Sequence, residues 1–150
     1  ASKCVQQVRQ LIAHAATMPL QLQPCLRDVW HDHVFFTNDE VTGVIDFGAM
    51  RHDTVAADVA RLLGSLAADD RRMWEVGIDA YHAARPLTYD ERTVVTALDA
   101  AHGLIGGTNW IRWLFVEGRL FERMDEVETR MRWLQRRLAS FAEQGPTWLT

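Results

Sequence analysis

Hydrophobic residues recur at helical spacing along most of the chain. Between residues 3 and 16 they form one stripe, at Val5, Val8, Leu11, Ile12 and Ala15, which is typical of an amphipathic helix. Similar stripes predict further helices over residues 55–66, 70–85, 88–117 and 124–144. Two short apolar segments, residues 34–36 and 41–45, flank a polar turn and predict a β-hairpin. The pattern therefore predicts a mainly α (α+β) domain, in which helices support one hairpin that would not be stable alone.

Polar residues and glycines refine these boundaries. Asp53 or Thr54 is a suitable N-cap for the helix that begins near residue 55. Thr88 and Glu91 have the spacing of a capping box at the start of a later helix. The glycines within residues 103–107 either interrupt that helix or allow a neighbour to pack closely against it. A turn at residues 145–146 is expected to end the last helix.

Size and composition narrow the class of protein. The 150 residues, 48% of them hydrophobic, suit one domain with a sizeable core. A net charge of −4 argues against a nucleic-acid partner. We expect the arginines of residues 130–137 to form a solvated helix face, with an anion-binding patch as the alternative. No apolar run approaches the roughly 18 residues of a membrane span, and no signal pattern is visible, so we expect a cytoplasmic protein without a membrane partner. The cysteines, Cys4 and Cys25, predict packing rather than a disulfide framework or a nucleophile.

The most informative residues flank the hairpin. Asp28 lies in a polar loop before the first strand, and Asp46 follows the second strand, eighteen residues later. Because a hairpin brings its two ends together, we expect these carboxylates to lie close to each other. One carboxylate can orient a hydroxyl group or water, and the other can hold a metal that carries phosphate. The pattern therefore favours phosphate chemistry on a small-molecule substrate.

These residues, in this order, resemble a known family. His33 follows Asp28 by five residues, Asp46 begins an Asp-Phe-Gly segment, and Asp58 begins Asp-Val-Ala. Residues 24–64 are thereby similar to the aminoglycoside phosphotransferase and choline kinase family, which is protein-kinase-like. The resemblance implies a kinase-like C-terminal helical lobe with one embedded catalytic hairpin. It also implies that Asp28 is the catalytic aspartate that accepts or orients the substrate hydroxyl, Asp46 the metal-binding aspartate, and Asp58 the acid that braces the loop.

The sequence departs from that family in ways that bear on function. Leu26 and Arg27 stand where the family has His-Gly, and His33 stands where it has a metal-binding Asn. The chain has no Gly-rich strand-turn-strand and no apolar strand that carries a nucleotide-pairing lysine, because its only lysine is Lys3. We therefore expect residues 1–150 to be a single domain that resembles the C-terminal lobe, with the N-terminal nucleotide lobe absent and ATP binding doubtful.

The segment His31-Asp32-His33 suggests a second kind of chemistry. On a strand or extended loop, His31 and His33 would lie on one side and could bind a metal together with Asp46. The metal could be zinc, manganese or magnesium, and imidazole favours the first two. The candidate site is therefore Asp28 as the catalytic residue, with His31, His33 and Asp46 as metal ligands and Asp58 as the brace.

Three functions remain open at this point. The first is a truncated phosphotransferase that acts on a small hydroxyl-bearing substrate. The second is a stand-alone metal-dependent hydrolase that uses the cluster of His31, His33 and Asp46, with phosphate esters as candidate substrates. The third is a non-catalytic binding or dimerisation module. A homodimer is expected because the hairpin side, with Phe35 and Phe36, would expose an apolar patch without a nucleotide lobe. Trp110 and Trp113 are expected to pack in the core, with an aromatic wall for an amine substrate as the alternative.

Overall fold

The computed structural model describes residues 2–144, and it is built mainly from helices. The helices are α1 (Ser2–Ala15), α2 (Val55–Ala67), α3 (Arg71–Ala84), α4 (Tyr89–Ile111) and α5 (Met124–Gln144). The strands are β1 (Gln23–Cys25), β2 (Val34–Thr37), β3 (Glu40–Val44) and β4 (Arg51–Asp53). A 3₁₀ turn, η1 (His31–His33), precedes β2, and a π-helical segment, η2 (Arg112–Val116), extends α4. The predicted mainly helical fold with a hairpin is confirmed.

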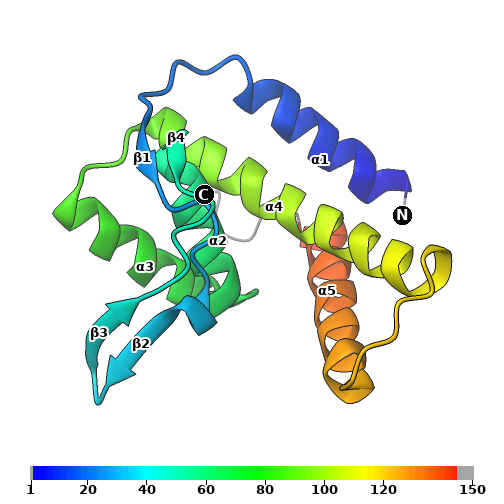
Figure 1. Cartoon of the computed structure of the whole chain (residues 1–150). Helices are drawn as coiled ribbons and strands as arrows, with labels where there is room; N and C mark the ends of the chain where they lie inside the picture. The colour runs from blue at the N-terminus through cyan, green and yellow to red at the C-terminus, as the bar shows by residue number, and fades with distance from the viewer. Residues whose placement is uncertain (1, 145–150) are drawn as a thin grey trace.

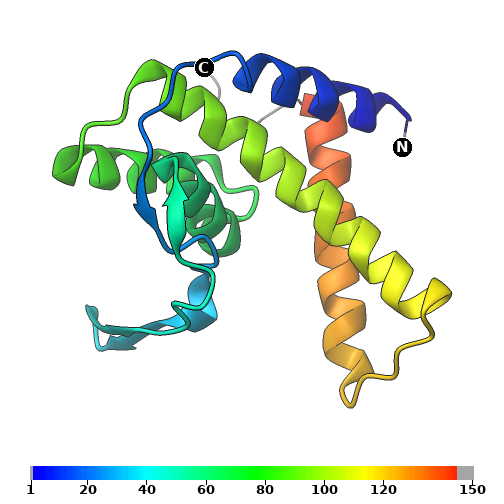
Figure 2. The ribbon, with the colours of Figure 1, turned by 45° about the horizontal axis from the view of Figure 1, so that its top comes forward.

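The long helix α4 is the centre of the molecule. It packs against α1, α2 and α5, and α3 packs against α2 (Figure 1). A view turned by 45° shows α1 running beside α4 while α5 crosses it (Figure 2). The core lies between α2, α3 and α4, where Val55, Ala56, Trp74, Val95 and Ala97 are all buried. The hairpin β2–β3 projects away from this core in both views (Figures 1 and 2).

The predicted helix signals have the expected geometry. Thr54 is the N-cap of α2, and Thr88 and Glu91 form the capping box of α4. The glycines at 103, 106 and 107 do not interrupt α4, and they lie where α4 faces α5. A Cβ atom placed at Gly106 would lie 3.5 Å from the Leu134 side chain of α5, which is an ordinary van der Waals distance. The approach of the two helices therefore does not require glycine at this position. The turn predicted at residues 145–146 lies outside the described residues.

Two antiparallel strand pairs position the loop that precedes the hairpin. The predicted pair β2–β3 joins Val34 to Val44 and contains a register shift after Phe35. The second pair, β1–β4, joins Gln23 to Asp53 and Cys25 to Arg51. This pair was not predicted, because three-residue strands carry no readable alternation. It places the start of the loop beside the start of α2.

The prediction of a solvated arginine face on α5 is wrong at Arg137. Its side chain is only 11% exposed and donates to the Asp99 carboxylate at 2.6 Å and to the Gly64 carbonyl at 3.0 Å. Arg132 does face solvent and pairs with Glu128. One side of α5 therefore directs an arginine side chain into the interior of the protein.

None of the helices between residues 2 and 144 is long and apolar enough to span a membrane.

Candidate active site

The loop after β1 is held by the start of α2. The two carboxylate oxygens of Asp58 accept the backbone N–H groups of Leu26 and Arg27, at 2.8 and 2.6 Å. Arg27 has a positive φ of 67°, which costs a non-glycine residue about 1–2 kcal/mol. Its side chain is fixed by an ion pair with Asp53 at 2.6 Å. These contacts match the bracing geometry expected of Asp58 and hold Arg27 in a conformation that glycine adopts freely.

Asp28, His33 and Asp46 converge at the base of the hairpin. Each offers one potential ligand atom, and these atoms lie within 4.8 Å of one another. Asp28 comes from the braced loop, His33 from the end of η1, and Asp46 from the turn after β3, where its φ is +62°. A histidine and two carboxylates at this spacing suit a divalent cation. The convergence follows from the hairpin, as the sequence predicted.

The hydrogen bonds of His33 define its orientation. Its Nδ1–H donates to the backbone carbonyl of Asp28 at 2.7 Å, and its Nε2 accepts the indole N–H of Trp30 at 2.8 Å. The Nε2 atom also lies 3.8 Å from the Asp46 carboxylate. Anchoring one nitrogen to a carbonyl is how metal-ligating histidines are commonly oriented. The residues fit a metal, provided that Trp30 releases Nε2 when the metal binds.

Asp28 has a partner that sequence reasoning missed. Arg61 of α2 donates through Nε and Nη2 to the same Asp28 oxygen, Oδ1, at 3.1 and 3.0 Å. The other oxygen, Oδ2, accepts no hydrogen bond from the described part of the chain and can accept one from a substrate. Arg61 lies three residues after Asp58 on the same helix face, a spacing that could have predicted it.

His31 does not join the other candidate ligands. Residues 31–33 form a 3₁₀ turn, in which positions two apart point in different directions, so the expectation of a shared side for His31 and His33 was wrong. The His31 Nε2 lies 3.2 Å from the Asp32 carboxylate, and its Nδ1 is buried without a hydrogen-bond partner among the described residues. The ring lines a neighbouring cavity instead.

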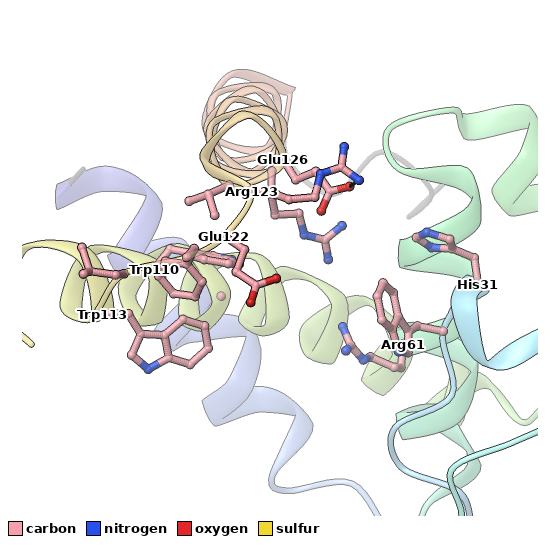
Figure 3. Close-up of a pocket in the computed structure, with 13 residues that line it drawn as sticks. His31, Arg61, Trp110, Trp113, Glu122, Arg123 and Glu126 are labelled. Carbon is pink, nitrogen blue, oxygen red and sulfur yellow. Dashed lines mark ion pairs between the residues drawn. The ribbon is translucent and has the colours of Figure 1, made fainter. Parts of the chain in front are cut away.

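This cavity has a volume of about 820 Å³ and lies between η1, α2, α4 and α5. His31 and Arg61 stand on one side, with Trp110 and Trp113 on the opposite side and Glu122 between them (Figure 3). Trp110 and Trp113 are half-buried and pack edge to face, so their predicted place in the core was wrong. Arg61 lines this cavity and also donates to the Asp28 carboxylate, so one side chain joins the cavity wall to the converging residues.

Comparison with known proteins agrees with this geometry. The sequence model of the phosphotransferase enzyme family matches residues 3–95, which include Asp28, His33, Asp46 and Asp58. The chain belongs to this phosphotransferase family. The resemblance inferred from the motifs is thereby confirmed. No solved structure matches the chain.

Several curated relatives of this chain are named homoserine kinases. The protein from Rhodopseudomonas palustris is 32% identical over 126 residues, which cover 79% of this chain and 38% of the relative. The protein from Methylobacterium nodulans is 33% identical over 126 residues, covering 79% of this chain and 39% of the relative. The protein from Polaromonas naphthalenivorans is 34% identical over 80 residues, which cover 49% of this chain and 25% of the relative. The chain therefore spans less than half the length of these relatives.

Proposed function

We propose that Asp28, His33 and Asp46 form a phosphoryl-transfer site that acts on the hydroxyl group of a small substrate. The observation that carries this proposal is the convergence of their side-chain atoms within 4.8 Å, on a loop held by Asp58, in a chain of the phosphotransferase family. Phosphoryl transfer depends mainly on positioning and on neutralising charge, and both tasks suit this arrangement.

Each residue has a separate role in this proposal. Asp28 orients the substrate hydroxyl through Oδ2 and accepts its proton, while Arg61 holds Oδ1 and fixes the carboxylate plane. His33 and Asp46 would hold a divalent metal. When bound, this metal neutralises charge on the phosphate oxygens. Imidazole is a better ligand for zinc or manganese than for magnesium, so we propose one of these two as the metal.

The substrate class is taken from the relatives. Because these proteins are named homoserine kinases, we propose a short hydroxy amino acid as the phosphate acceptor. ATP as the phosphate donor also belongs to this proposal, and we expect this chain alone to bind ATP poorly. The hydrolase alternative used the cluster of His31, His33 and Asp46, and it is the weaker candidate because His31 lines the cavity and does not join the other two residues. Self-association stays a prediction. It rests on the exposed apolar side chains of the hairpin, since Phe35 and Phe36 are 50% and 55% exposed.

A chimaeric enzyme tests the proposal. The matched region of the Rhodopseudomonas palustris homoserine kinase is replaced by this chain, and ADP formation with L-homoserine is measured. We expect activity in the chimaera and a loss of about 10²–10⁴-fold in Asp28→Asn, because the general base is removed. Asp39→Asn is the matched control, since Asp39 lies exposed in the hairpin turn. Equal activity of the two variants would refute the role of Asp28.

A further inference from the structure

Arg130 of α5 is a half-buried cation without an acidic partner. It forms no ion pair among the described residues, and its guanidinium stacks 4.3 Å from the Trp133 ring centroid. Burial lowers its pKa, and the nearby cations Arg61 and Arg137 lower it further, while Asp32 opposes the shift. Gathering like charges in a partly desolvated place is unfavourable unless an anion completes the site. An anionic ligand would therefore bind favourably here.

A second guanidinium lines the cavity beside Arg130. Arg61 uses Nε and Nη2 on Asp28, which leaves its Nη1 free of hydrogen bonds within the described chain. Arg61 and Arg130 also line a second, small cavity of about 30 Å³ beside the first, so the two arginines are neighbours. A planar acid group suits such paired guanidinium donors.

The other side of the cavity carries acidic side chains. Glu122 forms no ion pair in the described chain, and it stands between the tryptophan side and the arginine side (Figure 3). Glu126 lies nearby and pairs with Arg123. The cavity thus carries cations next to Asp28 and an unpaired carboxylate farther along. This polarity suits a molecule with both an acid group and an ammonium group.

We propose that Arg130 and Arg61 bind the carboxylate of the substrate and so make the site selective for short hydroxy acids. This inference rests on the proposed function, because it identifies the substrate group that the same site recognises. Since Arg61 also holds Asp28, a bound carboxylate lies one side chain away from the catalytic carboxylate. A short acid therefore reaches Asp28 Oδ2 with its hydroxyl, and Arg130 acts as a specificity-determining residue.

Ligand titrations of this chain, followed by NMR, test the inference without requiring catalysis. The probes are L-homoserine, 4-hydroxybutyrate, which lacks the ammonium group, and 3-aminopropan-1-ol, which lacks the carboxylate. We expect Arg130→Gln to weaken binding of both acids by about tenfold or more, because it removes a charge-assisted contact, and to leave the amino alcohol unaffected. Arg132→Gln is the matched control on the exposed face of α5, and it should bind all three probes like the wild type. Arg130→Lys, which keeps the charge, should bind the acids with intermediate affinity.

The outcomes separate this inference from the proposed function. Equal affinity of wild type and Arg130→Gln for L-homoserine would overturn the inference, as would equal affinity of the wild type for L-homoserine and the amino alcohol. If Arg130→Gln does not fold, Arg130→Lys takes its place, and equal affinity of the wild type and Arg130→Lys for L-homoserine would overturn the inference. Acid binding that depends on Arg130 in a chimaera without transfer activity would support the inference and contradict the proposed function. Phosphoryl transfer without selectivity for acids would support the proposed function and contradict the inference.

Discussion

Replacing Asp58 by asparagine should loosen the catalytic loop and destabilise the whole domain. The two carboxylate oxygens of Asp58 accept the N–H groups of Leu26 and Arg27 at 2.8 and 2.6 Å. Asparagine keeps one acceptor oxygen but presents an NH₂ group to the second N–H. That N–H loses its partner in a partly buried position, and the positive φ of Arg27 loses part of its support.

The expected magnitude follows from these contacts. A hydrogen bond to a charged group contributes about 1.5–3 kcal/mol, so Asp58→Asn should lower the free energy of unfolding by about 2–3 kcal/mol. In a domain of this size each kcal/mol shifts Tm by about 2–4 °C, which predicts a decrease of roughly 4–12 °C. The amides of Leu26 and Arg27 should also exchange their hydrogens faster.

Urea unfolding followed by circular dichroism measures the effect directly. Asp79→Asn is the matched control, because Asp79 is exposed on α3 and the substitution there should change stability by less than about 0.5 kcal/mol. If Asp58→Asn were as stable as this control, with unchanged exchange at Leu26 and Arg27, the bracing role of Asp58 would be wrong.

Further predictions concern the metal, the nucleotide, the thiols and the pH dependence. In calorimetry, the chain should bind Mn²⁺ more tightly than Mg²⁺. The Asp46→Ala variant should lose this binding, and the His33→Asn variant should shift the preference towards Mg²⁺. Unchanged Mn²⁺ affinity in Asp46→Ala would exclude this site. The chain alone should bind Mg-ATP weakly, and a micromolar Kd would contradict that expectation. Burial raises the pKa of the Cys25 thiol, which donates to the Asp53 carbonyl, so Cys25 should react with a thiol reagent only after unfolding; rapid reaction of the native protein would disprove this. Burial and the nearby Arg61 lower the pKa of His102 from 6.5. As the pH falls, the imidazole of His102 is therefore protonated in the unfolded state before it is protonated in the folded state, so stability should fall below pH 6.5. Tm measured at pH 7.5 and 5.5 should show this fall, and His102→Gln should remove part of it.

The sequence predicted those parts of the site that depend on local order along the chain. The hairpin brings Asp28 close to Asp46, and it was predictable because two short apolar segments flank a polar turn; the position of His33 follows from its spacing to Asp28. Helix signals such as the capping box of α4 were also readable, since they involve residues only three positions apart.

Features that depend on packing between distant segments were not predicted. Arg61 was missed although its spacing to Asp58 puts it on the face of α2 that meets the loop, because its partner Asp28 belongs to a distant segment. The short pair β1–β4, which sets α2 beside that loop, leaves no visible sequence pattern. The inward direction of Arg137 and the placement of Arg130 depend on how α5 crosses α4. His31 was misplaced because the sequence does not distinguish an extended loop from a 3₁₀ turn.

The most direct test of the central claim is the identity of the phosphorylated product, observed by ³¹P NMR. The chimaeric enzyme is incubated with ATP, Mn²⁺ and L-homoserine, in wild-type form and with Asp28→Asn. A phosphoryl-transfer site at Asp28, His33 and Asp46 predicts a phosphomonoester signal that grows together with ADP and is absent in the variant. Inorganic phosphate as the sole product, or an equal phosphomonoester signal in Asp28→Asn, would contradict the claim.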